Sequence, residues 1–524
     1  MKKKTFYLTT PIYYPSDNLH IGHAYTTIIA DCIARYKRMR GYDVRFLTGT
    51  DEHGEKIERA AKENGVTPIE YVDEIVGNIK ELWKTLQISN DDFIRTTEKR
   101  HVDAVQKIFS KLLEQGDIYK GEYSGKYCVP CESFWTEAQL DDNGNCPDCG
   151  RPVEDRVEQS YFFKMSKYAD KLVEIYDNNP GFIEPESRKT EMLSNFIKPG
   201  LEDLSVSRTS FTWGIPVKED PEHVIYVWID ALANYITSLG YTSENEELFD
   251  KYWSEDTEIL QIVGKEIVRF HTIYWPIMLE ALDLRKPDKV YAHGWLIMKD
   301  GKMSKSKGNV VRPEALIERY GIDALRHYCL SQVVLGHDGV YTPELFIGCL
   351  NTDLANSLGN LLNRTVSMVD KYFDGTTKLT SSNTSFDETL KEKAQNMIKE
   401  YETNMDKYYV DKASNAVFSF ISDLNKYIDD TQPWVLAKDE SKADELNTVL
   451  FNLCAGLRQV GILLKPFLLD ASQSILEQLQ VSVEAREYES VYNFEAMNTY
   501  TVKKMDPIFN RLDVAKELEE LGNL

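Results

Sequence analysis

Two short segments far apart in the chain carry residue types that could bind and stabilise a nucleotide triphosphate. The first is His-Ile-Gly-His at residues 20–23, and the second is a lysine-rich stretch that contains Lys302 and Lys305. Imidazoles at the start of a helix can contact phosphate groups, because free backbone N–H groups and the helix dipole attract anions there. Ammonium groups on a loop rich in glycine and serine can move onto negative charge that develops during a reaction. Together the two segments predict phosphate chemistry on a nucleotide.

The histidine pair lies at a predicted strand-to-helix junction. Residues 5–10 are an apolar stretch typical of a strand, and residues 24–40 carry apolar side chains at the spacing of one helix face. Gly41 then provides a C-terminal stop, and residues 44–48 predict a second strand. Gly22 has no side chain that would keep a base or a sugar away from the backbone. The junction therefore predicts a helix N-terminus that binds phosphate.

The lysine-rich stretch is spaced by glycines. Within nine residues it contains Lys299, Lys302, Lys305 and Lys307, interrupted by Gly301 and followed by Gly308. Taken alone, such a stretch is typical of a solvated basic loop, and histidines near a turn are commonly structural. The order of the two segments and the strand–helix–strand context of the first favour the nucleotide interpretation over chance.

The length and composition of the chain limit the possible classes of protein. A chain of 524 residues is too long for one core and predicts two to four domains. The sequence shows no run of about 18 apolar residues and no secretory signal after the N-terminal lysines, so neither a membrane span nor export is expected. Four cysteines are scattered singly in apolar patterns, which is typical of reduced core residues in the cytoplasm. The net charge of −23 disfavours a general nucleic-acid coat protein, although local basic patches could still bind a partner.

The hydrophobic patterning changes along the chain in a way that predicts several domains. Residues 1–115 alternate between strand and helix, with Thr67 and Pro68 opening a helix that ends near Leu86. An irregular section follows to about residue 220, with helices near residues 168–178 and 186–196. Strands are then expected at residues 223–229, 258–263 and 289–293, with helices starting near residues 230 and 265, and amphipathic helices dominate from about residue 343.

The fold expected from this pattern is α/β, a Rossmann-type parallel sheet split by an insertion and followed by an all-α helical bundle. The expected boundaries are 1–115 and 221–325 for the two halves of the catalytic domain, 116–220 for the insertion, 326–350 for a junction and 351–524 for the helical domain.

The insertion contains two closely spaced cysteine pairs. Cys128 and Cys131 form one pair, Cys146 and Cys149 form the other, and fourteen residues separate the pairs. Each pair can present two thiolates to one ion, and four thiolates complete a closed tetrahedral zinc site of the structural kind. Metal binding could contribute roughly 10–16 kcal/mol to the folding of such a subdomain. Two disulfides are the alternative, and the reduced compartment disfavours them.

In its motifs the chain resembles the class I aminoacyl-tRNA synthetases, whose two signature segments are the histidine and lysine segments above. Within that class it resembles the methionyl-tRNA synthetase family, and the resemblance covers essentially the whole chain. The supporting stretches are Pro-Ile-Tyr-Tyr-Pro at 11–15, Thr-Gly-Thr-Asp-Glu-His-Gly at 48–54, Tyr-Val-Trp-Ile-Asp-Ala at 226–231, Ala-His-Gly-Trp at 292–295, Asn-Leu-Leu-Asn-Arg at 360–364 and Gln-Pro-Trp at 432–434.

The resemblance implies a two-step reaction. L-methionine and ATP would give methionyl-adenylate and pyrophosphate, and the methionyl group would then pass to the 3′ end of tRNA(Met), including the initiator. By the same resemblance, His20 and His23 contact the ATP phosphates, and Lys302 and Lys305 stabilise the departing pyrophosphate. Mg²⁺ would accompany ATP through its phosphates, without a dedicated protein cage.

The resemblance also implies the ligand-binding residues. Asp51 would bind the ammonium group of methionine, and aromatic rings would contact its polarisable thioether. The implied methionine-binding residues are Ile12, Tyr14, Asp51, Trp228, Ala231, Tyr235 and His293. The implied ATP-binding residues are His20, Gly22, His23, Gly264, Glu266, Lys302 and Lys305, with His271 in the segment expected near the ribose. The family often has aspartate where this chain has Glu266.

In the helical domain, the resemblance implies that Asn360, Arg364 and Trp434 read the CAU anticodon. Trp434 offers a stacking face, and Asn360 and Arg364 are spaced to lie on one helix face. Without the resemblance, a tryptophan in a helical protein is more often part of the core. The chain ends at Leu524, before the point where some relatives continue into an appended tRNA-binding, dimer-forming module, so a monomer is expected.

Three other interpretations remain open from the sequence. The chain could be a class I synthetase for leucine, valine, isoleucine or cysteine, or a smaller nucleotidyltransferase that shares the histidine segment. It could also be a tRNA-binding paralogue without catalytic activity, although intact His20, His23, Lys302 and Lys305 argue against that. The expected partners are ATP, methionine and tRNA, without a membrane or DNA.

Overall fold

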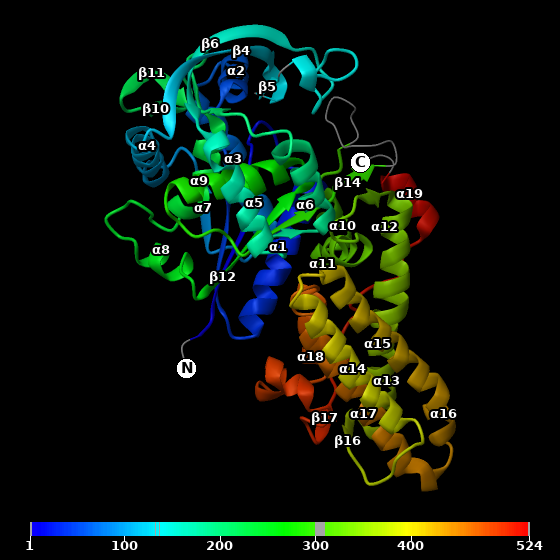
Figure 1. The fold of residues 1–524 in the computed structure, drawn as a ribbon. Helices are drawn as coiled ribbons and strands as arrows, with labels where there is room; N and C mark the ends of the chain where they lie inside the picture. The colour runs from blue at the N-terminus through cyan, green and yellow to red at the C-terminus, as the bar shows by residue number, and fades with distance from the viewer. Residues whose placement is uncertain (1–2, 132, 136, 299–309, 522–524) are drawn as a thin grey trace. The chain divides into compact units, whose positions relative to one another are not determined.

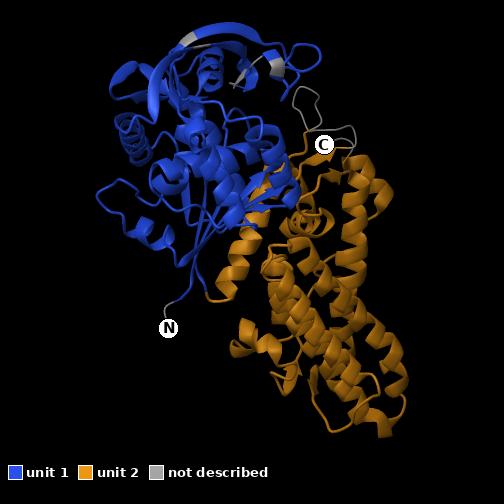
Figure 2. Ribbon diagram, viewed as in Figure 1, with its two compact units in different colours: residues 1–19, 42–293 blue, residues 20–41, 294–524 orange. Residues whose placement is uncertain are grey.

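The computed structural model describes residues 3–131, 133–135, 137–298 and 310–521. The chain forms two compact units, which Figure 2 shows in different colours. The first unit consists of residues 1–19 and 42–293, and the second consists of residues 20–41 and 294–524.

The first unit is organised around a parallel sheet with the strand order β3-β2-β1-β12-β13-β7. Thr5 of β1 pairs with Asp43 of β2 on one side and with Thr257 of β12 on the other. The strands are β1 (Thr5–Tyr13), β2 (Asp43–Thr50), β3 (Asp92–Arg95), β7 (Ile183–Glu184), β12 (Thr257–Gly264) and β13 (Lys289–His293). In sheets of this kind ligands bind beyond the carboxyl ends of the strands. The predicted α/β class with a parallel sheet is confirmed.

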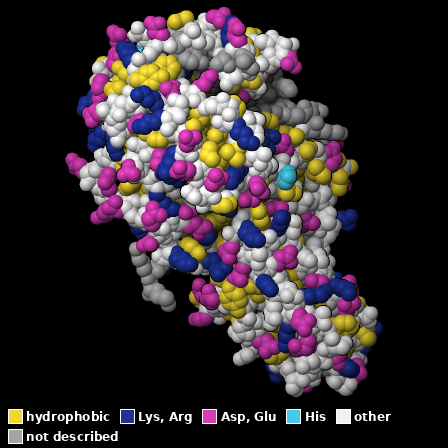
Figure 3. All heavy atoms as spheres, in the orientation of Figure 1, with side chains coloured by type: hydrophobic (Ala, Val, Ile, Leu, Met, Phe, Trp, Pro, Cys, Tyr) yellow, Lys and Arg dark blue, Asp and Glu magenta, His cyan; other side chains and the backbone are white. Residues whose placement is uncertain are grey.

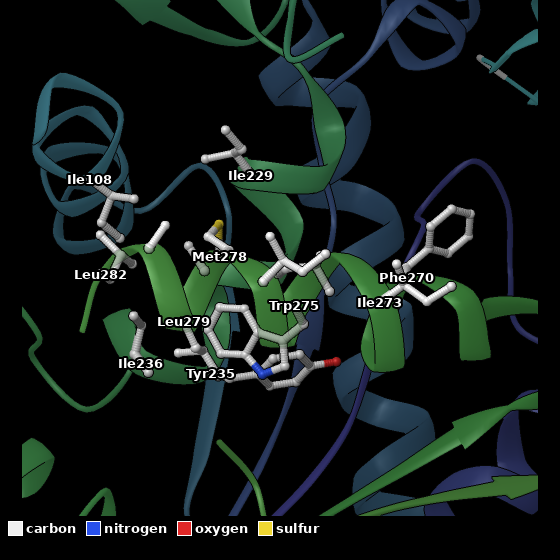
Figure 4. Close-up of a cluster of buried hydrophobic side chains, with 14 of the residues drawn as sticks. Ile108, Ile229, Tyr235, Ile236, Phe270, Ile273, Trp275, Met278, Leu279 and Leu282 are labelled. Atoms are coloured by element: carbon white, nitrogen blue, oxygen red, sulfur yellow. The ribbon is translucent and has the colours of Figure 1, made fainter. Parts of the chain in front are cut away.

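Helices and two smaller sheets complete the first unit. The helices are α2 (Glu55–Asn64), α3 (Pro68–Thr85), α4 (Lys99–Glu114), α5 (Ala169–Asn178), α6 (Glu186–Met192), α7 (Val227–Thr237), α8 (Glu247–Tyr252) and α9 (Trp275–Ala281). The start of α3 is as predicted, because Thr67 caps it and the Glu70 carboxylate accepts a hydrogen bond from the Thr67 backbone. Figure 4 shows core side chains from α7 and α9, including Tyr235, Trp275 and Met278, packed against one another.

The insertion is an antiparallel sheet in the order β5-β4-β6-β8, and Figure 1 shows β4 and β6 as a long curved pair. Its strands are β4 (Ile118–Cys128), β5 (Ser133–Trp135), β6 (Glu154–Phe163) and β8 (Leu204–Ser205). A second antiparallel sheet, in the order β10-β11-β9, is formed by β9 (Ser207–Arg208), β10 (Ile215–Val217) and β11 (Asp220–Ile225).

Two sequence predictions in this region are wrong. Residues 223–229 are not a strand of the parallel sheet, because β11 is antiparallel and ends at Ile225, and α7 begins at Val227. The apolar run continues into the buried first turns of α7, so its hydrophobicity gives no sign of the boundary. Ile183 and Glu184, expected within the irregular section, instead pair with β13 as the edge of the parallel sheet.

The second unit is mostly helical. Its elements are α1 (Ile21–Met39), β14 (Leu296–Met298), α10 (Pro313–Tyr320), α11 (Ile322–His327), β15 (Gly339–Tyr341), α12 (Pro343–Cys349), α13 (Asn360–Phe373), β16 (Thr376–Lys378), α14 (Asp387–Met405), α15 (Val410–Thr431), α16 (Pro433–Leu436), α17 (Ala443–Leu463), α18 (Leu469–Gln478), β17 (Thr499–Thr501) and α19 (Val514–Leu521). A π-helical stretch, Leu350–Gly359, joins α12 to α13.

A buried ion pair ties three parts of the second unit together. Arg326 of α11 is fully buried, and its Nη1 lies 2.8 Å from Oδ2 of buried Asp31 in α1. The same guanidinium donates to the carbonyl oxygens of Pro466 and Phe467, at the turn between α17 and α18. Because each of these buried polar groups has its partner, the arrangement fixes α1 against the bundle.

One helix of the bundle has the length and composition of a membrane span, although no membrane span is expected from the sequence. This segment, Glu440–Leu463, contains α17, and its apolar window is 100% buried inside the structure. It packs against α13, α15 and α18, so its apolar faces are covered by other helices of the bundle. Burial of this kind is typical of a central core helix.

Candidate active site

The two histidines of the first signature segment form the N-terminus of α1. His20 is the N-cap, and its Nδ1 accepts a hydrogen bond of 3.0 Å from the Gly22 backbone. Nδ1 of His23 accepts a hydrogen bond of 3.1 Å from the His20 backbone, which completes a capping box made of imidazoles. A Cβ on residue 22 would lie 2.9 Å from the His20 ring, so a larger residue there would displace the imidazole from its capping position. The predicted placement of both histidines at a helix start is confirmed.

The flanks of the lysine-rich segment approach the same helix start. Lys302 and Lys305 lie outside the described residues. Before the segment, β14 packs against α1. After it, the carbonyl oxygen of Val311 accepts a hydrogen bond of 3.1 Å from the backbone N–H of Ile21. Both ends of the segment are therefore anchored at the helix that carries the histidines.

A cavity of about 250 Å³ opens at the carboxyl ends of β1 and β2 in the first unit. Most of its walls are aromatic or aliphatic, which suits a small apolar ligand. Five of the predicted methionine-binding residues line it together with Asp51: Ile12, Tyr14, Trp228, Ala231 and Tyr235. Asp51 is the only carboxylate among the described lining residues, and it is 7% exposed. The cavity, called the amino-acid pocket below, thus combines an apolar body with one acidic group.

The histidine of this pocket is not the expected one. His293, at the end of β13, does not belong to the lining, whereas His271 does. Nε2 of His271 lies 2.6 Å from the Tyr235 hydroxyl, and its Nδ1 lies 2.9 Å from the carbonyl oxygen of Ile267. A carbonyl oxygen only accepts, so Nδ1 carries the proton and Nε2 accepts from Tyr235. Burial lowers the pKa of His271 to about 4, so the imidazole is neutral at pH 7.

This hydrogen-bond chain changes the expected contact with a thioether. The Tyr235 hydroxyl proton is used by His271. A sulfur atom in the pocket would therefore be held mainly by contact with the polarisable faces and edges of the rings. His271 follows Ile267 by four residues, and residues at this spacing lie on the same face of a helix. This spacing is the sequence signal that could have identified His271 as part of the pocket wall.

The backbone that carries Asp51 is fixed by the two residues that follow it. The buried Glu52 carboxylate accepts a bidentate pair of hydrogen bonds from Arg95, at 2.7 and 2.9 Å. Nδ1 of His53 lies 2.7 Å from the carboxylate of Asp230, on α7. Bidentate and charge-assisted contacts of this kind restrict the segment to one conformation. They hold the backbone that carries Asp51 at the pocket.

Asp230 is the centre of a buried network that the sequence did not predict. Its second oxygen lies 2.8 Å from Nε2 of His101, whose Nδ1 lies 2.7 Å from the Thr237 hydroxyl. Burial alone would raise the pKa of Asp230, but the charges and hydrogen bonds of His53 and His101 lower it to about 2. The carboxylate is therefore ionised at pH 7 and can orient both imidazoles. No motif could have revealed it, because 177 and 129 residues separate it from its partners.

The segment expected near the ribose lies at the carboxyl end of β12. The Glu266 carboxylate folds back over Gly264, where a Cβ would lie 2.6 Å from both carboxylate oxygens. Glu266 is exposed, so its carboxylate reaches solvent at the edge of the sheet. A carboxylate at the carboxyl end of a parallel strand is in the position that binds ribose hydroxyls in other nucleotide-binding sheets.

The four cysteines of the insertion lie together. The ligand atoms of Cys128, Cys131, Cys146 and Cys149 all lie within 4.8 Å of one another. The Cys128–Cys149 and Cys131–Cys146 sulfur pairs are 3.5 and 3.8 Å apart. A tetrahedral zinc ion with Zn–S bonds of about 2.3 Å requires sulfurs about 3.8 Å apart, so the residues fit the ion. Burial raises the pKa of the Cys128 and Cys131 thiols, whereas the Arg151 backbone and the other thiols outweigh burial and lower the pKa of Cys149, so Cys149 is the thiol most readily ionised for zinc binding.

This zinc knuckle forms part of the amino-acid pocket. Pro130 and Cys131 line the pocket beside Trp228 and Lys56. The knuckle is also joined to α2, because the Tyr127 hydroxyl lies 3.3 Å from the Glu55 carboxylate. A zinc ion held by the four cysteines would therefore support a wall of the pocket, and four thiolate ligands would leave it without an open position for chemistry.

We expect removal of the metal to raise the KM for methionine about tenfold, because the loop that carries Pro130 and Cys131 would no longer be held in place. Chelation at neutral pH should release about one zinc per chain, measured by a metallochromic dye alongside pyrophosphate exchange. Readdition of Zn²⁺ is the control and should restore the KM. Loss of the metal with an unchanged KM would contradict a role of the knuckle in the pocket.

The candidate anticodon residues lie on α13 and α16 of the second unit. Asn360 is the first residue of α13, and Arg364 lies one turn later. Nη2 of Arg364 is 3.5 Å from the Asp429 carboxylate near the end of α15, in a solvent-exposed pair that contributes little to stability. Trp434 is 41% exposed in α16, so the alternative of a core tryptophan is not supported. An exposed indole is available for base stacking.

The two units carry the parts that define a class I aminoacyl-tRNA synthetase: a parallel nucleotide-binding sheet, the histidine segment at a helix start and a helical domain. A family model described as tRNA synthetases class I (M) matches residues 6–159 and 151–366. A second model, described as the anticodon binding domain of methionyl tRNA ligase, matches residues 379–514.

Within this class, the individual relatives share one amino-acid specificity. A methionine–tRNA ligase of Halalkalibacterium halodurans is 58% identical, over 100% of this chain and 81% of the relative. One of Caldanaerobacter subterraneus subsp. tengcongensis is 59% identical, over 99% of this chain and 81% of the relative. The structure of Mycobacterium tuberculosis methionyl-tRNA synthetase in complex with methionyl-adenylate superimposes with a TM-score of 0.92 at 40% identity, covering 97% of this chain and 100% of that one. The chain belongs to the methionine–tRNA ligase family.

Proposed function

We propose that this chain activates L-methionine with ATP and transfers the methionyl group to the 3′ end of tRNA(Met). The observation that carries the proposal is the amino-acid pocket, an aromatic cavity of about 250 Å³ with Asp51 as its single described carboxylate. An amino acid with a long, uncharged, polarisable side chain matches this combination, with its ammonium group on Asp51 and its thioether among the rings. The family relationship supports the same assignment.

In the first step, a carboxylate oxygen of methionine attacks the α-phosphorus of ATP, and pyrophosphate leaves with the bridging oxygen. His20 and His23 contact the phosphates, and Lys302 and Lys305 stabilise the charge on the departing pyrophosphate. Gly22, Gly264 and Glu266 complete the ATP-binding set, with Mg²⁺ carried by the nucleotide. Because the protein supplies no covalent chemistry, positioning and charge stabilisation account for the rate.

In the second step, a hydroxyl of the terminal ribose of tRNA attacks the carbonyl carbon of methionyl-adenylate, and AMP leaves. Asn360, Arg364 and Trp434 contact the anticodon, with the exposed Trp434 ring as a stacking platform. Residues 1–115 and 221–325 act as the catalytic domain, 116–220 as the insertion, 326–350 as the junction and 351–524 as the anticodon-binding domain. The chain acts as a cytoplasmic monomer, without a membrane or DNA partner.

The test is amino-acid-dependent pyrophosphate exchange with methionine, leucine, isoleucine, valine and cysteine. We expect kcat/KM for methionine to exceed that for each of the others by about 100-fold or more, because the pocket rejects branched or shorter side chains. A higher kcat/KM with any of the other four amino acids would overturn the assigned specificity. The absence of exchange with all five would overturn the assigned activity.

A further inference from the structure

A second cavity, of about 360 Å³, lies beside the amino-acid pocket in the first unit. The two cavities share Trp228 as a wall. The second one, called the Arg269 cavity below, is also lined by Trp135, Phe196, Arg208, Arg269 and Tyr274. Its volume is in the range of ligand sites and is sufficient for one nucleotide. Neither the family models nor the proposed roles above assign a ligand to it.

Arg269 is surrounded by aromatic rings. Its guanidinium carbon lies 4.8 Å from the ring centre of Phe270, 5.1 Å from Phe196, 5.6 Å from Trp135 and 5.9 Å from Tyr274. Among the described residues, the Arg269 guanidinium makes no ion pair with a carboxylate and no hydrogen bond to a protein acceptor. Cation–π contacts hold the group in place but leave its five N–H donors available.

Arg269 is a positively charged group in a strongly acidic protein. The net charge is −23, and Figure 3 shows acidic side chains spread over the visible face, interspersed with lysine and arginine. Glu202 and Asp203 line another part of the cavity, and Asp203 already accepts hydrogen bonds from Tyr119 and Ser166. A phosphate would therefore be attracted to Arg269 and repelled by the wall formed by Glu202 and Asp203. These carboxylates could instead accept hydrogen bonds from an amino group of the base.

The rings come from separate elements that meet at this cavity. Trp135 belongs to β5 of the zinc knuckle, and Phe196 to the helical turn Leu193–Ile197 after α6. Arg269 and Tyr274 precede α9, and Figure 4 shows Phe270 at the end of the core row opposite Leu282. Trp228 stacks on Phe270 at a ring-centre distance of 3.4 Å. Flat walls of this kind accept a base by stacking, whatever its identity.

We propose that the Arg269 cavity binds an unpaired nucleotide at the 3′ end of tRNA, with the base against the aromatic walls and the phosphate on the Arg269 guanidinium. The inference rests on the proposed function, because it takes tRNA as the partner. Stacking surfaces next to a planar cation are the usual means of binding single-stranded RNA. The shared Trp228 wall places such a nucleotide beside the amino-acid pocket.

The test compares Arg269→Met with the wild type in binding two forms of tRNA(Met): the intact molecule and one lacking its last three nucleotides. We expect the wild type to bind intact tRNA about tenfold more tightly than truncated tRNA, and the variant to bind both equally. The Kd of each pair is measured by filter binding at one fixed salt concentration, since phosphate contacts depend on salt. Single-turnover transfer from preformed methionyl-adenylate to intact tRNA should fall by a similar factor.

Two further variants separate the proposed role from general effects. Phe196→Leu keeps apolar volume but removes a ring, so it should lower the preference for intact tRNA in the same direction. Lys198→Met removes an exposed charge near Phe196 that does not line the cavity, and it should leave the preference at its wild-type value. An equal loss of affinity for intact and truncated tRNA in Arg269→Met would overturn the proposal, as would a preference that is retained.

A free nucleotide has the same chemistry as a tRNA end, so AMP binding is measured in parallel. A loss of AMP affinity in Arg269→Met with an unchanged preference for intact tRNA would assign the cavity to free nucleotides and overturn the tRNA proposal. Failure of the proposed function gives a different result, because wild-type protein would then show no methionine-dependent exchange. With normal exchange in the wild type, the binding comparison tests the Arg269 cavity alone.

Discussion

Replacement of Lys305 by alanine is expected to slow methionine-dependent pyrophosphate exchange about 10²–10³-fold, the usual effect of losing one donor to transition-state charge. The segment that carries Lys305 is anchored on both sides at α1, through β14 before it and the Val311–Ile21 hydrogen bond after it. The proposed role of Lys305 requires its ammonium group to reach phosphates that contact His20 and His23. The rate of exchange at saturating ATP and methionine is the measurement.

Lys307→Ala is the matched control for Lys305→Ala. It removes the same charge two residues along the segment, from a position without an assigned contact. If the general positive charge of the segment mattered more than one positioned ammonium, both variants would lose activity equally. Unchanged exchange in Lys305→Ala would remove this residue from the mechanism.

Asp51→Asn should raise the KM for methionine about 10²–10³-fold, because a substrate ammonium group in the amino-acid pocket would lose its anionic partner. The carboxylate is 7% exposed and is the only one among the described lining residues, so no neighbour in the described pocket wall can replace it. The pocket itself should persist, because the contacts of Glu52 and His53 hold the backbone directly after Asp51. The KM for methionine in pyrophosphate exchange is the quantity to determine.

A substrate analogue distinguishes this role from a structural one. 4-(Methylthio)butanoate lacks the ammonium group, so its inhibition constant should be nearly the same in the wild type and in Asp51→Asn. A large change for the analogue as well would indicate that the substitution deforms the pocket. Glu63→Gln, on the exposed face of neighbouring α2, is the control for a general change in charge and should leave the KM for methionine unaltered.

Much of the fold was predictable because local signals and tertiary structure agree. Thr67 and Pro68 open α3 as capping rules require, and the strand predicted at residues 289–293 is β13. The prediction of secondary structure failed where a helix is buried on nearly all sides, because no alternation of apolar and polar residues then distinguishes it from a strand. The first turns of α7 are buried on nearly all sides, so the apolar run from β11 into α7 resembles one long strand. β7 has only two residues, and it belongs to the sheet because it pairs with β13. No local sequence pattern indicates such a pairing.

The site was predictable where a motif carries the chemistry within a few residues. The histidines at a helix start and the cysteine pairs are local, and the sequence identified both, although not the capping box that the two imidazoles form. His271 and Asp230 depend instead on helices that bring distant residues together, and both were missed in their roles. His293 lies at the end of a sheet strand, as the pattern predicts, but β13 does not reach the amino-acid pocket. Proximity of this kind follows from strand order, which the sequence pattern does not fix.

The cysteine-bearing knuckle provides walls for two neighbouring cavities, Pro130 for one and Trp135 for the other. A sample in which only a fraction of molecules holds zinc would consequently behave as a mixture of two enzymes. Its saturation curve for methionine would be the sum of two hyperbolas, and titration with Zn²⁺ would shift amplitude from the weak component to the tight one without moving either midpoint. Metal occupancy therefore has to be established before kinetic constants of different preparations are compared.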